Sequence, residues 1–237
     1  MKTLTLLDKP FHIVDENLNA TDRTVPDTEG GVHEIPCQAE TYKLLAAGRK
    51  NILEIGFNTG ASAAIFLEAS PKSRVTSFDI GTHEYVDPHK MRIDAQYPGR
   101  HELILGDSAS MIPQYKRDNP DAIFDLILID GDHTYPAPAI DLANCFLLAD
   151  ENTVVILDDV ICAPAGAEEF QFYTYLVGPS MAWREAATEG FITGATFPNY
   201  SVDHLLNHGG GECYTRTNGK SGLHRGMAWF SYNMRYE

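Results

Sequence analysis

Apolar residues along this chain gather into short continuous runs that alternate with segments of mixed character. Five of these runs have the length of buried strands, and they span residues 52–57, 75–80, 102–107, 124–130 and 153–159. Segments typical of helices lie before, between and after these runs, at 37–48, 61–69, 88–96, 108–116, 137–148 and 166–185. Continuous apolar strands that alternate with helices are typical of a parallel sheet covered on both faces. The pattern therefore predicts an α/β fold.

The pattern changes after Glu189. Residues 190–195 and 226–232 are predicted to be closing strands, with an antiparallel pair among them, which completes a seven-stranded, mostly parallel sheet. Residues 198–225 between them form a polar, glycine-rich insertion, and residues 1–35 form a polar arm or lid. We expect one main domain over residues 36–237, with the arm and the insertion bordering its ligand site.

Composition narrows the classes of partner. A chain of 237 residues suits one large α/β domain, and its formal net charge of −15 would repel nucleic acids and anionic membranes. The apolar runs are too short to span a bilayer, and the N-terminus does not resemble a signal peptide. The four cysteines form no disulfide framework: Cys37, Cys145, Cys162 and Cys213. We therefore expect a cytoplasmic protein without nucleic acid or membrane partners.

The most informative segment is residues 51–60, where an apolar strand meets a glycine turn. Gly56 and Gly60 lack a Cβ, so a ligand can approach the backbone while the amide groups of the following helix face it. Glu54, two residues before the first glycine, suits a ligand with a positive charge better than a pyrophosphate. A dinucleotide turn would need a further glycine where Asn58 stands.

Acidic residues end four of the five predicted strands, at Asp79, Asp107, Asp130 and the pair Asp158–Asp159. The carboxyl ends of parallel strands share one rim, where open α/β sheets bind ligands. Neighbouring strands lie about 5 Å apart, so Asp130 and the acidic pair are expected to cluster. Clustered carboxylates need a shared proton or a cation, and oxygen ligands favour Mg²⁺, with Mn²⁺ or Ca²⁺ as alternatives.

Two motifs make a resemblance specific: Ile-Asp-Gly-Asp-His-Thr-Tyr at 129–135 and Leu-Asp-Asp-Val at 157–160. With the glycine turn and Asp79, they resemble class I S-adenosylmethionine-dependent methyltransferases, and in particular the metal-dependent small-molecule O-methyltransferases. The branch of macrocin and other antibiotic-sugar O-methyltransferases is the most similar, and catechol O-methyltransferase is more distant. The resemblance covers about residues 36–165 and implies a Rossmann-like methyltransferase fold.

The resemblance also implies roles for individual residues. Asp130, Asp158 and Asp159 would be metal ligands, with Asp159 where the catechol enzyme has asparagine. His133, three residues after Asp130, would be the general base, so Asp130 and His133 are the predicted catalytic residues. The predicted S-adenosylmethionine contacts are Glu54, Gly56, Phe57, Asn58, Thr59, Gly60, Ser62, Asp79, Ile80, Asp107, Ser108 and Asp130. Among these, Glu54 and Gly56 would neighbour the amino-acid end, Asp79 the ribose, and Asp107 and Ser108 the adenine.

The implied reaction is transfer of a methyl group to a hydroxyl of a small molecule, such as a sugar, a polyketide or a phenolic natural product. A metal that holds adjacent oxygens lowers the pKa of the hydroxyl and aims it at the methyl group, and His133 accepts the proton. Related enzymes are often dimers or larger assemblies, so a homodimer is also an expectation.

Other interpretations remain open at this point. The chain could be a metal-independent N- or O-methyltransferase, a nicotinamide-dependent oxidoreductase, or a scaffold without catalytic activity. Asp132 or Asp107 could serve only as a cap, Asp158–Asp159 could cap a helix, and His133 could be structural. His204, His208 and Cys213 have a spacing that zinc ligands can share, although a fourth ligand is not evident.

Overall fold

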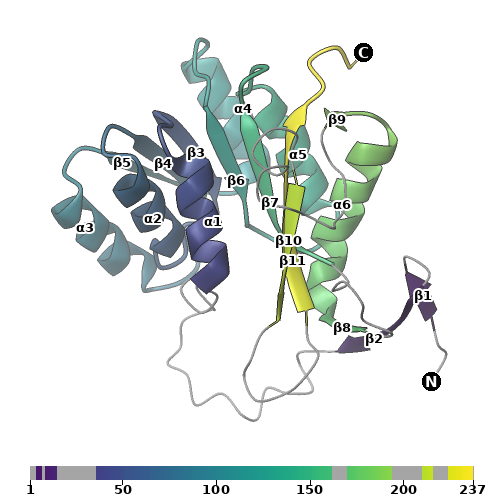
Figure 1. Cartoon of the computed structure of the whole chain (residues 1–237). Helices are drawn as coiled ribbons and strands as arrows, with labels where there is room; N and C mark the ends of the chain where they lie inside the picture. The colour runs from purple at the N-terminus through teal and green to yellow at the C-terminus, as the bar shows by residue number, and fades with distance from the viewer. Residues whose placement is uncertain are drawn as a thin grey trace.

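The computed structural model describes residues 4–6, 9–14, 36–161, 170–193, 210–215 and 224–236. Its centre is a twisted sheet of parallel strands, shown in Figure 1. The parallel strands are β3 (Asn51–Ile55), β4 (Arg74–Asp79), β5 (His101–Leu105), β6 (Leu126–Ile129) and β7 (Val154–Val160). They follow the order β7-β6-β3-β4-β5, so the chain leaves β3 toward one edge and returns to its other side at β6.

Two longer C-terminal strands extend the sheet beyond β7. β11 (His224–Tyr232) pairs antiparallel with β7, and β10 (Gly210–Thr215) pairs antiparallel with β11. The short strand β9 (Ile192–Thr193) also pairs with β11. The predicted Rossmann-like sheet, mostly parallel with antiparallel closing strands, is thus confirmed.

Helices cover both faces of the sheet, as the continuous apolar strands predicted. One face packs against α1 (Pro36–Ala46), α2 (Ala61–Ala69) and α3 (Val86–Gln96), and the other packs against α4 (Ser108–Asp118), α5 (Ala137–Phe146) and α6 (Val177–Thr188). Successive strand residues alternate between the two cores: in β3, Ile52 belongs to the first and Leu53 to the second. The same alternation directs polar residues of the strands toward one helical layer or the other.

The predicted helix at 166–185 is wrong in its first part. Residues 170–173 form strand β8, a 3-10 turn covers Thr174–Leu176, and α6 begins only at Val177. The sequence Phe-Gln-Phe-Tyr of β8 is rich in aromatic residues that favour strands. β8 pairs in parallel with β2 (Lys9–Val14), which pairs with β1 (Leu4–Leu6), and the three form a second small sheet.

The predicted insertion at 198–225 contains a strand of the main sheet, since β10 occupies 210–215. His204 and His208 lie outside the described residues, as do 15–35 of the predicted arm, and Cys213 belongs to β10. Of the predicted strand at 190–195, the structure describes residues 190–193, and among these β9 comprises Ile192–Thr193. Within the described part of the chain, no helix has the length and apolar character needed to cross a membrane.

Candidate active site

The turn between β3 and α2 lies at the carboxyl rim of the sheet and is built from left-handed residues. Gly56, Asn58 and Gly60 have φ values of 94°, 50° and 71°. A Cβ on Gly56 would lie 2.1 Å from the backbone oxygen of Asp130, so only glycine fits this close approach. The turn after β3 and the segment after β6 are therefore packed backbone to backbone.

Glu54 lies beneath this turn rather than on its surface. Its side chain is fully buried and accepts hydrogen bonds from the hydroxyls of Ser62 (2.8 Å) and Ser77 (2.6 Å). Burial raises the pKa of Glu54 to about 8, although the two hydroxyls oppose the shift. The structure thus gives Glu54 a neutral, supporting position under the turn. Its predicted place beside the amino-acid end of the cofactor stays a prediction.

Asp79, at the end of β4, joins the turns that follow β3 and β4. Its Oδ2 accepts a hydrogen bond from the amide of Asn58 (2.9 Å), and its Oδ1 accepts one from the amide of Gly81 (2.8 Å). The next residue, Ile80, is 59% exposed at the same rim. This arrangement leaves an acidic and an apolar group side by side where a ribose and a base were predicted to bind.

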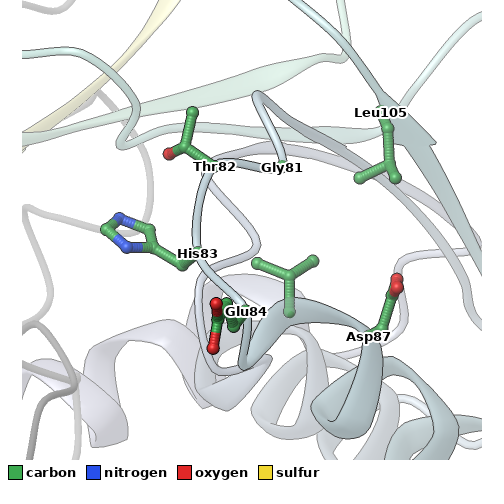
Figure 2. Close-up of a pocket in the computed structure, with 7 residues that line it drawn as sticks. Gly81, Thr82, His83, Glu84, Asp87 and Leu105 are labelled. Atoms are coloured by element: carbon green, nitrogen blue, oxygen red, sulfur yellow. The ribbon is translucent and has the colours of Figure 1, made fainter.

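A pocket of about 170 Å³ lies next to Asp79. The loop from Gly81 to Asp87 curves around it, and Leu105 at the end of β5 closes the opposite side (Figure 2). Leu105 is about half exposed. The pocket therefore combines an apolar wall with polar groups of the loop.

The other predicted cofactor residues around the turn after β3 differ in how far their side chains are buried. Phe57 is buried and stacks on His101 with ring centroids 5.0 Å apart. Ser62 directs its hydroxyl to Glu54, and Thr59 is half-buried. Phe57 and Ser62 thus shape the turn from below, and the backbone of the turn is what a ligand would meet.

Asp107 and Ser108 begin α4. The carboxylate of Asp107 accepts a hydrogen bond from the amide of Ala109 (3.0 Å), so the interpretation of Asp107 as a helix cap is confirmed. The hydroxyl of Ser108 donates to Asp141 of α5 (2.7 Å). Burial raises the pKa of Asp141 to about 6. The adenine contacts of Asp107 and Ser108 stay predictions.

Three of the predicted catalytic and metal residues converge at the ends of β6 and β7. Asp130, His133 and Asp159 each offer a ligand atom, and these atoms lie within 4.8 Å of one another. Nε2 of His133 is 3.4 Å from a carboxylate oxygen of Asp130 and 3.4 Å from one of Asp159. Burial lowers the pKa of His133, but the hydrogen bond to Asp130 and the charge of Asp159 outweigh it and raise the pKa to about 9. The cluster therefore attracts positive charge.

Asp158 lies outside this cluster, although it was predicted to be a ligand beside Asp159. Its Oδ2 accepts hydrogen bonds from Nε2 of Gln38 and from the hydroxyl of Tyr42 (2.9 Å), both on α1. The physical reason is that β7 continues to Val160 with a β-bulge against β11 at the acidic pair and a left-handed φ of 56° at Asp159, so the two side chains diverge. The structure groups Asp130 with Asp159 and turns Asp158 toward α1.

Sequence reasoning missed several residues that shape the cluster. The ring of Tyr175 stacks on His133 at 5.4 Å. A Cβ on Gly178 of α6 would lie 2.0 Å from the backbone oxygen of His133, so α6 packs closely on this loop. The glycine at position 178, near the start of a helix, is the sequence feature from which this close packing could have been predicted. Asp132 accepts a hydrogen bond from the amide of Thr134 (2.7 Å), as expected of a residue that caps a turn.

Comparisons with known proteins agree with this geometry. Solved structures with the same fold include an O-methyltransferase from Bacillus cereus in complex with SAH, with a TM-score of 0.59 and 19% identity over 91% of this chain and 88% of that one. Another is the O-methyltransferase TomG from Streptomyces achromogenes, involved in tomaymycin synthesis and solved with SAM, with a TM-score of 0.59 and 18% identity over 88% and 83% of the two chains. A third is cofactor-bound Rv0187 from MTB, with a TM-score of 0.60 and 17% identity over 92% and 88%.

The sequence itself is similar to one family over part of its length. The search of curated protein sequences finds no significant match. Residues 53–160, from the glycine turn through the end of β7, match a family described as a methyltransferase domain. Over these residues the chain is therefore similar to the methyltransferase domain family.

Proposed function

We propose that the protein is an S-adenosylmethionine-dependent O-methyltransferase that acts on a hydroxyl of a small molecule with the help of a divalent cation. The observation that carries the proposal is the convergence of Asp130, His133 and Asp159 within 4.8 Å, beside the glycine turn of a methyltransferase domain. Two carboxylates from rigid strand ends suit a hard cation such as Mg²⁺ or Mn²⁺.

The rim also has groups that suit the methyl donor. The side-chain oxygen of Asn58 is buried and has no hydrogen-bond partner among the described residues. Such an acceptor is costly unless a ligand supplies a donor, and the ammonium group of S-adenosylmethionine is one. Asp79 would hold the ribose hydroxyls, and Ile80 and Leu105 would pack against the adenosine.

When bound, S-adenosylmethionine would supply an electrophilic methyl group, and a cation would make the acceptor hydroxyl more acidic. The residues of the chain hold these groups and move the proton. Asp130 and Asp159 would hold the cation, whose charge would offset the two carboxylates that raise the pKa of His133. The neutral imidazole of His133 would then accept the proton that the acceptor oxygen loses as its bond to the methyl carbon forms. The electron pair of the broken carbon–sulfur bond stays on sulfur.

The class of acceptor follows from charge and from similarity. The net charge of −15 disfavours polyanions such as nucleic acids. TomG, which shares the fold, takes part in the synthesis of tomaymycin. We therefore propose a sugar, a polyketide or a phenolic natural product with adjacent oxygens as the acceptor.

A second candidate is a metal-independent methyltransferase. It is favoured by the distance of 3.4 Å from Nε2 of His133 to each of the two carboxylates, because a protonated His133, whose pKa is raised to about 9, can balance their charge without a metal. The cation dependence of turnover separates the two candidates.

The test uses the full chain after treatment with a chelator. S-adenosylhomocysteine formation is measured with a panel of sugar, polyketide and phenolic diols, with and without Mg²⁺. Activity that is lost in the chelator and restored by Mg²⁺ supports the proposal, and full activity in excess chelator overturns its metal part. Asp159→Ala, which removes the oxygen ligand, should behave like metal removal, whereas the exposed carboxylate control Asp118→Ala should be active. Absence of S-adenosylmethionine binding would overturn the proposal as a whole.

A further inference from the structure

Asp141 is a buried carboxylate on α5 that lies outside the cation site. Its side chain is 2% exposed, and its Oδ1 accepts a hydrogen bond from the hydroxyl of Ser108, the first residue of α4, at 2.7 Å. Among the residues that the structure describes, no other group donates a hydrogen bond to this carboxylate. A buried carboxylate needs its donor and binds it strongly. The hydrogen of the Ser108 hydroxyl is therefore directed to Asp141.

Ser108 lies next to the part of the rim where the ribose and the base of the methyl donor are proposed to bind. The amide of Gly106 donates a hydrogen bond to the backbone oxygen of Asp79 (2.8 Å), so the turn after β5 is joined to the end of β4. Ser108 follows Gly106 by two residues and is partly exposed. A Cβ on Gly131 would lie 3.7 Å from Oδ2 of Asp141. Asp141 thus lies between the loops that follow β5 and β6.

The bond to Asp141 determines what the hydroxyl of Ser108 can offer a ligand. A serine hydroxyl has one hydrogen to donate and two lone pairs that can accept. Burial raises the pKa of Asp141 to about 6, so at about pH 7.5 its carboxylate is ionised and can only accept. Ser108 must then donate to Asp141, and its oxygen can only accept from a ligand. The exocyclic amino group of adenine is a donor, whereas the keto oxygen of hypoxanthine at the same position is an acceptor.

We propose that Asp141 is a positioning residue that makes Ser108 an acceptor for the exocyclic amino group of adenine, so that the pair selects the base of the methyl donor. Ser108 touches the base, and Asp141 acts only through Ser108. The inference rests on the proposed function, because it concerns the donor that binds at this rim. It does not depend on the cation.

A purely structural role of the pair makes a different prediction. If Ser108 and Asp141 only fasten α4 to α5, removing either one loosens the site for every purine ligand, and the affinities for adenine and hypoxanthine ligands fall together. If the pair sets the polarity of the site, the affinity for the adenine ligand falls relative to the other. The ratio of the two Kd values therefore separates the two roles.

The experiment measures, by calorimetry at about pH 7.5, the Kd of the full chain for S-adenosylhomocysteine and for S-inosylhomocysteine, which carries hypoxanthine in place of adenine. The test variants are Ser108→Ala, Asp141→Leu and the two combined. Asp141→Ala is a second replacement in case leucine prevents folding. The matched control is Asn144→Leu, which removes another hydrogen bond from α5 to α4, from Nδ2 of Asn144 to the backbone oxygen of Ala109 (3.1 Å).

Wild type should prefer the adenine ligand by at least about 10-fold, the scale of one hydrogen bond that is made with adenine and left unmade with hypoxanthine. Ser108→Ala and Asp141→Leu should each reduce this preference about 10-fold. Asp141→Leu should reduce it no further in the Ser108→Ala background, because Asp141 acts through that hydroxyl. Asn144→Leu should keep the wild-type ratio.

Each contrary result has a separate meaning. A wild-type protein that binds neither ligand overturns the proposed function, and this inference with it. If wild type binds S-adenosylhomocysteine but the ratio is unchanged by Ser108→Ala, or by both Asp141 replacements, the selection by the pair is wrong and the proposed function stands. A reduced ratio that Asn144→Leu shares would assign the effect to the packing of α4 on α5 and would also overturn the positioning role.

Discussion

The hydroxyl of Ser77 on β4 donates a 2.6 Å hydrogen bond to the carboxyl of Glu54 on β3, and both residues are fully buried. The same hydroxyl lies 2.7 Å from Nε2 of His101 on β5. The three polar groups thus form a chain across neighbouring strands, directly below the glycine turn. Burial shifts both ends of this chain toward their neutral forms, since the pKa of Glu54 rises to about 8 and that of His101 falls to about 4.

These shifts predict how the stability of the ligand-free protein depends on pH. The unfolded chain releases the proton of Glu54 near pH 4.5, whereas the folded protein keeps it to about pH 8, so stability falls as the pH rises through this window. His101 acts in the opposite direction only below pH 6.5, where the unfolded chain takes up a proton first. Between pH 6.5 and 8 the contribution of Glu54 should therefore lower the free energy of unfolding by about 2 kcal/mol.

Glu54→Gln isolates this effect, because the amide does not titrate and keeps the size of the side chain. Urea unfolding at pH 6.5, 7.25 and 8 measures the free energy for both proteins. The difference between wild type and variant should shift by about 2 kcal/mol in favour of the variant across this range. Parallel curves for the two proteins would show that Glu54 is ionised in the folded state.

Gly56→Ala should disrupt the site as well as the fold. Its φ of 94° is unfavourable for alanine, and the new Cβ would lie 2.1 Å from the backbone oxygen of Asp130. Gly48→Ala is the matched control, because Gly48 also has a left-handed φ, of 78°, but open space around its Cβ position. Thermal and urea unfolding should show a loss of about 1 kcal/mol for the control and about 3 kcal/mol or more for Gly56→Ala. Equal losses would mean that the turn and Asp130 are not tightly packed.

Asp79→Asn should weaken S-adenosylmethionine binding by at least about 10-fold, the scale of a hydrogen bond to a charged group. The carboxylate accepts from the amides of Asn58 and Gly81, and an amide side chain can accept from only one of them through its oxygen. Mn²⁺ affinity should be unchanged, since Asp79 is outside the cation cluster. Asp118→Asn, an exposed carboxylate at the end of α4, controls for the loss of charge alone and should bind S-adenosylmethionine normally. Weakening by both variants would point to a general electrostatic effect.

The parallel strands could be predicted from the sequence to within a few residues. Apolar residues dominate β3, β4, β6 and β7, which both helical layers bury, and they also mark the edge strand β5. Strand β10 could not be predicted in this way, because its sequence, Gly-Gly-Glu-Cys-Tyr-Thr, is polar and contains glycine. That strand is defined by backbone pairing with β11 at the edge of the sheet, which leaves little trace in the pattern of side chains.

The cluster of Asp130, His133 and Asp159 could be predicted only in part, because some of its geometry depends on local sequence and some on contacts between distant segments. Asp130 and His133 follow the end of β6, and their position depends on local sequence and on the shared rim of the sheet. The divergence of Asp158 from Asp159 depends on the bulge against β11 and on Gln38, which is 120 positions away in the chain. A motif of two adjacent acids gives no indication of either partner, so the sequence could place the pair but not assign each acid its role.

His133→Ala tests whether this residue is a base or a ligand. As a general base, His133 contributes about 10²- to 10⁴-fold to the rate, so turnover should fall by that factor while the affinities for S-adenosylmethionine and Mn²⁺ change little. His89→Ala, a histidine of α3 that packs on Tyr85, is the control and should retain full turnover. A loss of Mn²⁺ affinity that accompanies the loss of turnover would make His133 a third ligand beside Asp130 and Asp159, because its Nε2 is already 3.4 Å from both. Unchanged turnover would instead give His133 a structural role, in which its stacking on Tyr175 only holds the loop after β6 in place.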